Sequence, residues 1–293
     1  MRCVKLRARP GRGCGSGCRR RRRLCGARRS GVAWLAGAAL ALGSGVAPAA
    51  PAEELAVSAA ASLRGVLGEI GQTFESAHPG VNVALSFGAS NVLARQIEAG
   101  ANADVFLAAD EATVASLAAA GLVRPGTRVH IASNRLVVIQ AEDLTPPLLA
   151  PDDLGRPGLR RIALAAAQVP AGKYAREWLV RRGLLEVVSG RLLDVDDVRA
   201  TLAAVDSGSA DAGIVYATDA RVAKSARFAF AVPDDEQPRI AYVAAGIAGR
   251  PEAENRLADA FLRHLLTPES KATLRAAGFG PALTNGGASG AAP

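Results

Sequence analysis

Hydrophobic and polar positions follow two different periods along most of the chain. Short apolar runs at 55–60, 104–108 and 212–216 predict buried strands. The stretches 63–76 and 252–266 place apolar residues three or four positions apart, which is typical of amphipathic helices. Strand and helix signals follow one another at short intervals, and this order predicts an α/β protein with a mainly parallel sheet.

The βα signals form two series, which predict two lobes. The extended stretches 129–140 and 239–247 are long enough to cross between two bodies, and we expect hinge segments within 131–136 and 239–243. The residues after 284 are rich in Gly, Ala and Ser, a composition typical of disorder. The predicted division is a leader at 1–52, a first lobe at 53–130 plus 243–281, a second lobe at 131–242 with the hinge strands, and a disordered tail at 282–293.

The first 52 residues differ in composition from the rest. They hold 12 of the 35 Lys and Arg residues, none of the 27 Asp and Glu residues, and all four cysteines. The remainder keeps 23 basic against 27 acidic residues, a net charge of −4, so the net charge of +8 for the whole chain does not indicate a nucleic-acid partner. Without cysteine, the remainder has no disulfides, thiolate metal sites or cysteine nucleophiles.

This leader has the organisation of a secretory signal peptide. Basic residues at 19–29 precede an apolar stretch at 32–42, and small residues follow as far as Ala52. The 11 apolar residues are too short to cross a bilayer core of about 30 Å as a helix. We expect cleavage after Ala52, with Ala49 as the alternative, and a periplasmic location. The arginine run at 19–23 also suits nucleic-acid binding, but its position beside the apolar stretch favours export.

Motifs for enzyme chemistry are absent from the sequence. No G-x-S-x-G occurs, and Gly172-Lys173 lacks the glycine five positions earlier that a phosphate-binding loop needs. The histidines His78, His130 and His264 are scattered, and Asp194-Val-Asp-Asp197 lacks the glycine and ligand of a calcium loop. Surface positions and helix capping account for these residues. We expect no enzymatic activity, no cofactor and no site for a free metal cation.

A small or polar residue recurs where a predicted strand is followed by a helix. Ser62, Ser90, Pro170-Ala171-Gly172 and Asp197-Val198 all occupy such junctions. The first turn of a helix leaves up to four N–H groups unpaired and carries partial positive charge. Taken one by one, the serines suit ordinary helix capping. Taken together at the carboxyl ends of strands in two lobes, the junctions suit an anion site.

With these junctions, the sequence resembles the molybdate-binding proteins of bacterial ABC importers from about residue 55 to residue 281. The resemblance implies a two-lobed periplasmic binding protein fold of the type II kind with two hinge crossings. The segments that carry it keep the order and spacing of the family. They are Ala59-Ala-Ala-Ser-Leu63, Ser86-Phe-Gly-Ala-Ser-Asn-Val-Leu-Ala-Arg-Gln-Ile97, Ala103-Asp-Val-Phe106, Val169-Pro-Ala-Gly-Lys-Tyr174, Asp197-Val-Arg199 and Gly213-Ile-Val-Tyr-Ala-Thr-Asp219.

The resemblance also implies a ligand set of five residues around a tetrahedral oxyanion. Ser62 and Ser90 would donate hydroxyl and backbone N–H bonds from the first lobe. Ala171 and Val198 would donate backbone N–H groups from the second lobe, and Tyr216 its phenolic hydroxyl. On the residues alone, a core tyrosine with a satisfied hydroxyl group is the favoured interpretation of Tyr216.

The expected function is the capture of molybdate between the lobes and its delivery to a membrane ABC permease with its ATPase. Molybdate at neutral pH offers only acceptors, so a site made only of donors matches it and penalises a protonated phosphate. Tungstate has nearly the same size and charge and should bind comparably. The alternative ligand is sulfate or another tetrahedral oxyanion, which only cavity size would reject. We expect a monomer with no nucleic-acid partner.

Two functions from other classes compete with this hypothesis. An exported hydrolase could use Ser62 or Ser90 as a nucleophile, but neither has a histidine partner near it in the sequence. A ligand-sensing domain of a transcription regulator shares the two-lobed fold, but it needs a helix-turn-helix segment at one end of the chain. Here a predicted signal peptide and a short Gly/Ala-rich tail occupy the two ends.

Overall fold

The computed structural model describes residues 53–283, and the predicted signal peptide at 1–52 lies outside the described residues. The predicted disordered tail lies outside them as well, apart from residues 282 and 283. Between residues 53 and 283, no helix combines the length and the apolar character needed to cross a membrane.

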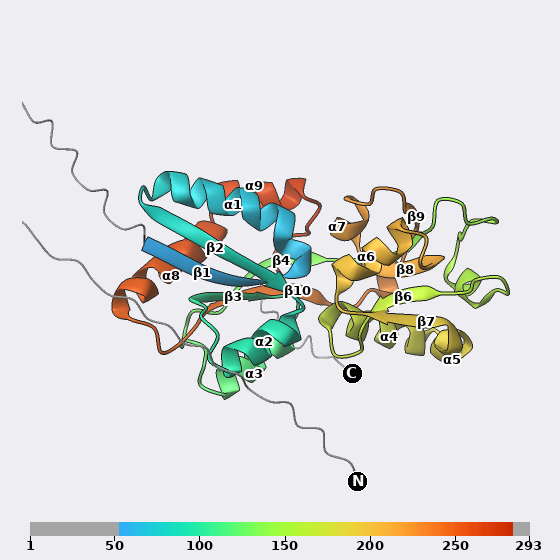
Figure 1. The fold of residues 1–293 in the computed structure, drawn as a ribbon, viewed down its shortest axis with the longest axis horizontal. Helices are drawn as coiled ribbons and strands as arrows, with labels where there is room; N and C mark the ends of the chain where they lie inside the picture. The colour runs from blue at the N-terminus through green and yellow to red at the C-terminus, as the bar shows by residue number, and fades with distance from the viewer. Residues whose placement is uncertain (1–52, 284–293) are drawn as a thin grey trace, which may run out of the picture. The chain divides into compact units, whose positions relative to one another are not determined.

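The first sheet has five strands, four of which run in the same direction (Figure 1). Strand β1 pairs in parallel with β2 and β3, and β10 pairs antiparallel with β3 and β4. In spatial order the strands are β2 (Val81–Gly88), β1 (Glu53–Ala60), β3 (Val105–Ala108), β10 (Ile240–Gly246) and β4 (Val129–Asn134).

Helices cover both faces of the first sheet. Successive side chains of β3 point to opposite faces and belong to two separate apolar clusters, one on each face. Val105 and Leu107 pack into the cluster that contains the apolar faces of α1 (Arg64–Ala77), α8 (Glu252–Leu265) and α9 (Pro268–Ala276). Phe106 and Ala108 point to the opposite face and pack against α2 (Ser90–Glu98) and α3 (Glu111–Ala119). A strand buried on both faces reads as a continuous apolar run, as β3 does.

The second sheet repeats this plan. Strand β6 pairs in parallel with β7 and β8, and β5 pairs antiparallel with β8 and β9. Its strands, in spatial order, are β7 (Leu192–Val195), β6 (Ile162–Ala165), β8 (Ala212–Tyr216), β5 (Leu136–Gln140) and β9 (Arg227–Ala231). Its helices are α4 (Pro170–Arg181), α5 (Leu185–Val188), α6 (Val198–Asp206) and α7 (Ala217–Ala220).

The chain passes twice between the two sheets. It passes first at Arg135, which separates β4 from β5, and then through residues 232–239, which join β9 to β10. The lobe boundaries expected at 130/131 and 242/243 fall inside β4 and β10, both of which belong to the first sheet. Three consecutive polar residues, Ser133, Asn134 and Arg135, interrupt the apolar pattern of 129–140, and the chain leaves the first sheet at this interruption rather than at 130/131.

The α/β class and the two-lobed plan are confirmed. The sheets are mixed, because in each of them four strands run in one direction and a single strand, β10 or β5, runs against them. The sequence pattern does not predict β7, β9, α5 or α7. These elements are only four or five residues long, and a single period of the pattern does not distinguish such short elements from loops.

Candidate functional site

A small cavity lies where strands from both sheets end and helices begin. Its volume is about 20 Å³. The lining includes Ser62 and Ser90, which follow β1 and β2, and Ala171, Val198 and Tyr216 from the second sheet and its helices. The structure therefore brings together all five residues that the sequence analysis singled out. No lysine or arginine belongs to the lining, and Asp197 is its one ionisable carboxylate among the described residues.

Three helices begin at the cavity. Ser90 is the first residue of α2, Ala171 is the second of α4, and Val198 is the first of α6. The N–H groups of a first helical turn have no partner within their own helix, so these three are free to bind a ligand. The helix dipoles add partial positive charge at the same place. The cavity therefore attracts an anion without any cationic side chain in its wall.

Asp197 caps α6 in a way that leaves one N–H group open. Its Oδ1 accepts hydrogen bonds from the backbone N–H groups of Arg199 (2.8 Å) and Ala200 (2.9 Å). Val198 lies between the cap and these two donors, and the cap does not engage its N–H group. Capping by Asp197, rather than calcium binding, was the preferred interpretation of this acidic run, and the structure confirms it.

Gly172 allows the start of α4 to approach the end of β6. A Cβ atom at this position would lie 2.0 Å from the carbonyl oxygen of Ala165 and 2.3 Å from that of Ala166. Both atoms are backbone, which cannot move aside as the end of a flexible side chain can. Only glycine permits this close packing, and the packing places the N–H group of Ala171 at the cavity.

Neither serine caps a helix, so the helix-capping interpretation is wrong. Ser62 belongs to the 3-10 turn Ala61–Leu63 that follows β1, and its Oγ lies 2.8 Å from the Tyr242 hydroxyl group. The Ser90 Oγ accepts a hydrogen bond of 3.1 Å from the backbone N–H of Ala109. A hydroxyl group that already accepts a bond keeps its own hydrogen for another partner. Ser90 is therefore ready to donate into the cavity.

Tyr216 is buried, yet its hydroxyl group has no partner. The residue is 1% exposed, and no residue between 53 and 283 forms a hydrogen bond with its phenolic oxygen. Burial, together with the nearby Tyr242, raises the pKa of the phenol far above its ordinary value, so the group stays protonated and remains a donor. The interpretation of Tyr216 as a core tyrosine with a satisfied hydroxyl group is wrong. A buried polar group without a partner costs about 1–3 kcal/mol, and a ligand in the cavity would relieve that cost.

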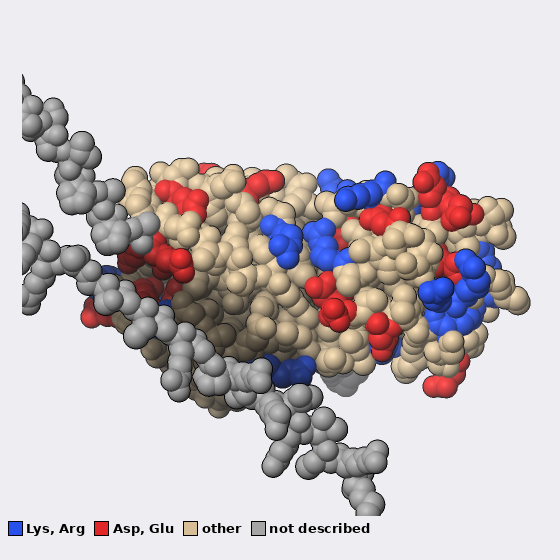
Figure 2. Space-filling view, in the orientation of Figure 1, with Lys and Arg blue, Asp and Glu red and all other residues tan. Residues whose placement is uncertain are grey.

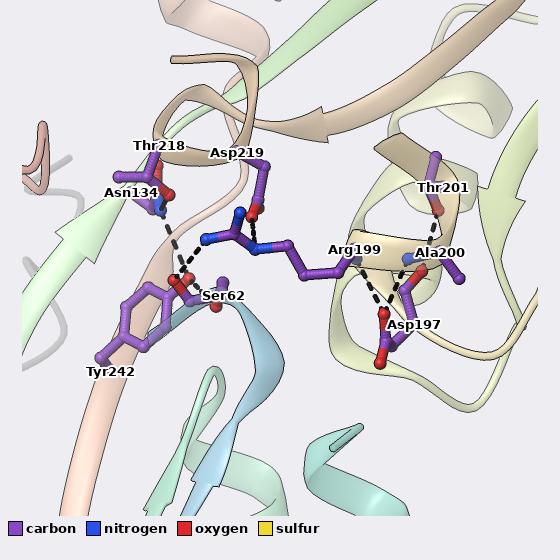
Figure 3. Close-up of polar contacts among 9 residues, drawn as sticks. All are labelled: Ser62, Asn134, Asp197, Arg199, Ala200, Thr201, Thr218, Asp219 and Tyr242. Carbon is purple, nitrogen blue, oxygen red and sulfur yellow. Dashed lines mark hydrogen bonds and ion pairs between the residues drawn. The ribbon is translucent and has the colours of Figure 1, made fainter. Parts of the chain in front are cut away.

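A buried ion pair, which the sequence analysis did not single out as a site feature, lies next to the lining (Figure 3). The side chain of Asp219 on α7 is 0% exposed, and its Oδ1 lies 2.8 Å from the Nε of Arg199. Burial raises the pKa of Asp219 to about 7, although Arg199 opposes this shift. Arg199 also donates from Nη2 to the carbonyl oxygen of Ser62 at 3.5 Å, so it links α6 to the first lobe.

The chain belongs to the family of bacterial extracellular solute-binding proteins, whose family model matches residues 55–280. Within that family it is similar to proteins named molybdate-binding protein ModA. The Escherichia coli relative is 32% identical over 254 residues, covering 84% of this chain and 97% of the relative. The Mycobacterium bovis relative is 40% identical over 177 residues, covering 59% of this chain and 66% of the relative.

Solved structures agree with this assignment. The Azotobacter vinelandii periplasmic molybdate-binding protein superimposes with a TM-score of 0.68 at 28% identity, covering 77% of this chain and 98% of that protein. The sulfate-binding protein SubI of Mycobacterium tuberculosis gives a TM-score of 0.69 at 19% identity, covering 78% and 87% of the two chains, which supports the fold alone. The relatives are substrate-binding proteins of transporters, so the expectation that the chain is not an enzyme is confirmed.

We predict that the substitution Gly172→Ala destabilises the protein by about 3 kcal/mol, the cost of forcing an extra methyl group against fixed backbone. Urea unfolding of the variant measures this change. Gly68→Ala in α1 is the matched control, because a Cβ atom there meets nothing within 4 Å. Alanine also has the higher helix propensity, by about 1 kcal/mol, so the control variant should be at least as stable as the wild type. Equal stabilities for the two variants would contradict the close packing at Gly172.

We also predict a pH-dependent stability that originates at Asp219. Because its folded-state pKa is about 7, the folded protein keeps a proton that the unfolded chain releases near pH 4. Stability should therefore fall as the pH rises from about 4 to about 7, by up to about 1.4 kcal/mol per pH unit. Denaturant unfolding of the wild type and of Asp219→Asn measures the difference between them. A difference that is constant across this range would rule out a raised pKa at Asp219.

Proposed function

We propose that the protein captures molybdate, and tungstate with it, in the cavity at the ends of the two sheets. The observation that carries this proposal is the buried Tyr216 hydroxyl group, which has no partner among the described residues and belongs to a lining with three helix N-termini. Every group offered there by the five residues of the ligand set is a donor. An ion that only accepts hydrogen bonds satisfies all of them at once.

The donors available match the needs of a dianion. The hydroxyl groups of Ser62, Ser90 and Tyr216, with first-turn N–H groups of α2, α4 and α6, provide about six hydrogen bonds. Each bond to a charged group contributes about 1.5–3 kcal/mol, and the sum offsets the loss of the ion's hydration. Phosphate at neutral pH carries at least one proton, which needs an acceptor that these groups do not offer. The donor set therefore favours unprotonated ions.

The volume of the cavity also restricts the ligand. At about 20 Å³ it is far smaller than the roughly 300–1,000 Å³ typical of sites for organic ligands. A compact ion is the class of ligand that fits. The acidic and basic side chains on the face shown in Figure 2 form small separate groups with uncharged surface between them. The lining itself holds no lysine or arginine, so the attraction for the ion comes from the donors of the cavity.

We infer that the protein acts outside the cytoplasm as the substrate-binding component of an ABC importer. Support comes from the family of extracellular solute-binding proteins and from relatives named molybdate-binding protein. In this role the loaded protein passes its ion to a membrane permease that is coupled to an ATPase. The composition of residues 1–52 supports export.

Isothermal titration with a series of oxyanions tests the proposed ligand. We expect binding heat with molybdate and tungstate at micromolar concentration, and no competition from phosphate at equal concentration. Competition between molybdate and sulfate distinguishes the proposal from its alternative, because sulfate also lacks a proton and differs mainly in size. Binding of sulfate in preference to molybdate, or no heat with either metal oxyanion, would overturn the proposal.

We predict that Tyr216→Phe weakens molybdate binding by about 10- to 100-fold without lowering the stability of the free protein. The variant loses one bond to the ion, but the hydroxyl group it removes has no partner to lose in the free protein. Titration calorimetry and urea unfolding measure the two effects separately. A variant that binds normally but unfolds more easily would instead show that Tyr216 is only a core residue.

A further inference from the structure

Behind Ser62 lies a chain of buried polar groups that the ligand set does not include (Figure 3). The Ser62 Oγ is 2.8 Å from the hydroxyl group of Tyr242 on β10. The Tyr242 hydroxyl group in turn lies 3.3 Å from the Nδ2 of Asn134, the last residue of β4. Tyr242 is 0% exposed and Asn134 is 7% exposed, so water does not compete for these groups.

The orientation of the Asn134 amide is fixed by a backbone donor. Its Oδ1 accepts a hydrogen bond of 2.9 Å from the N–H group of Arg135, and an N–H group must meet an oxygen atom. The Nδ2 therefore faces the other way and donates its two hydrogens, one to Tyr242 and one to the Thr218 Oγ1 at 2.9 Å. Thr218 belongs to α7 of the second lobe, so this amide also links the lobes next to the first crossing.

This orientation determines the direction of every hydrogen bond as far as the cavity. Tyr242 accepts from Asn134, and its own hydrogen then has one acceptor within reach, the Ser62 Oγ. The opposite direction would leave the Tyr242 hydrogen buried without an acceptor, which is unfavourable. Burial also raises the pKa of Tyr242 far above its ordinary value, so the phenol keeps its hydrogen. Ser62 therefore accepts from Tyr242 and has its own hydrogen left for the cavity.

We propose that Tyr242, held by Asn134, is a positioning residue that makes Ser62 a donor towards the ligand and thereby excludes protonated oxyanions. A serine hydroxyl group normally donates or accepts, and a serine that turns its lone pair towards the cavity would accept the O–H group of a phosphate. Tyr242 donates to one lone pair of the Ser62 Oγ and thereby fixes the orientation of the hydroxyl group, with its hydrogen turned towards the cavity. The hydrogen bonds from Asn134 to Tyr242 and from Tyr242 to Ser62 thus make a donor of a hydroxyl group that could otherwise donate or accept. The site then distinguishes ions by whether they carry a proton. This inference rests on the proposed function.

The test measures ion selectivity in Tyr242→Phe, which removes one oxygen atom and keeps the ring. We expect molybdate affinity to fall by about 10-fold, because the Ser62 hydroxyl group is no longer held in the orientation that donates to the ion. In the same variant, excess inorganic phosphate should compete with molybdate more strongly than it does in the wild type, because Ser62 can now accept. The measurement is titration with molybdate in the presence and absence of phosphate.

Thr218→Val is the matched control. It keeps the shape of the side chain and removes the other acceptor of the Asn134 amide, but it leaves the Tyr242–Ser62 bond in place. We expect its selectivity between molybdate and phosphate to equal that of the wild type. If phosphate competition rises equally in both variants, a general loosening explains the effect, and the inference is wrong.

The remaining outcomes separate the inference from the proposed function. A wild-type protein that binds no molybdate removes the proposed function and the inference with it. A wild type that binds molybdate, with a Tyr242→Phe variant of unchanged selectivity, removes the inference alone. Urea unfolding of each variant identifies a folding defect. For a Tyr242→Phe protein that does not fold, Asn134→Leu gives the second measurement, with the same gain in phosphate competition expected and unchanged selectivity counting against the inference.

Discussion

The structure depends on a set of buried hydrogen-bond donors that have no acceptor within the described chain. A protein normally satisfies its buried polar groups, and each exception is costly. Here the hydroxyl group of Tyr216 is such an exception, and it lies at a cavity where three helices begin. The packing around these groups holds them in place despite the unfavourable free energy of burying them without a partner. An anion that accepts every bond supplies what the chain itself lacks.

The two-sheet architecture is what gathers these donors. Parallel strands end at one edge of each sheet, and the helices that follow them begin there. A small cavity between such edges receives several helix N-termini from different parts of the chain. Local details then refine the arrangement: Gly172 allows the close approach of α4, and Asp197 caps α6 without engaging the N–H group of Val198. As a result, the N–H groups of Ala171 and Val198 remain available to a ligand.

Much of this arrangement could be predicted from the sequence, and the failures have physical reasons. The periodic stretches identified the long helices and buried strands, and the resemblance identified all five ligand-set residues that line the cavity. The lobe boundaries were misplaced, although the polar residues Ser133, Asn134 and Arg135 interrupt the apolar stretch where the chain leaves β4 for β5. The roles of Tyr242 and Asn134 were not predicted. They are set by pairings between residues far apart in the chain, such as Ser62 with Tyr242, which no local pattern records.

The most direct test of the account is a crystal structure of the protein grown with molybdate, with the metal located by its anomalous scattering. The account predicts one ion in the cavity, held by the hydroxyl groups of Ser62, Ser90 and Tyr216 and by the N–H groups of Ala171 and Val198. No lysine or arginine side chain should lie within hydrogen-bond distance of the ion. An ion bound elsewhere, or one held mainly by cationic side chains, would contradict the account.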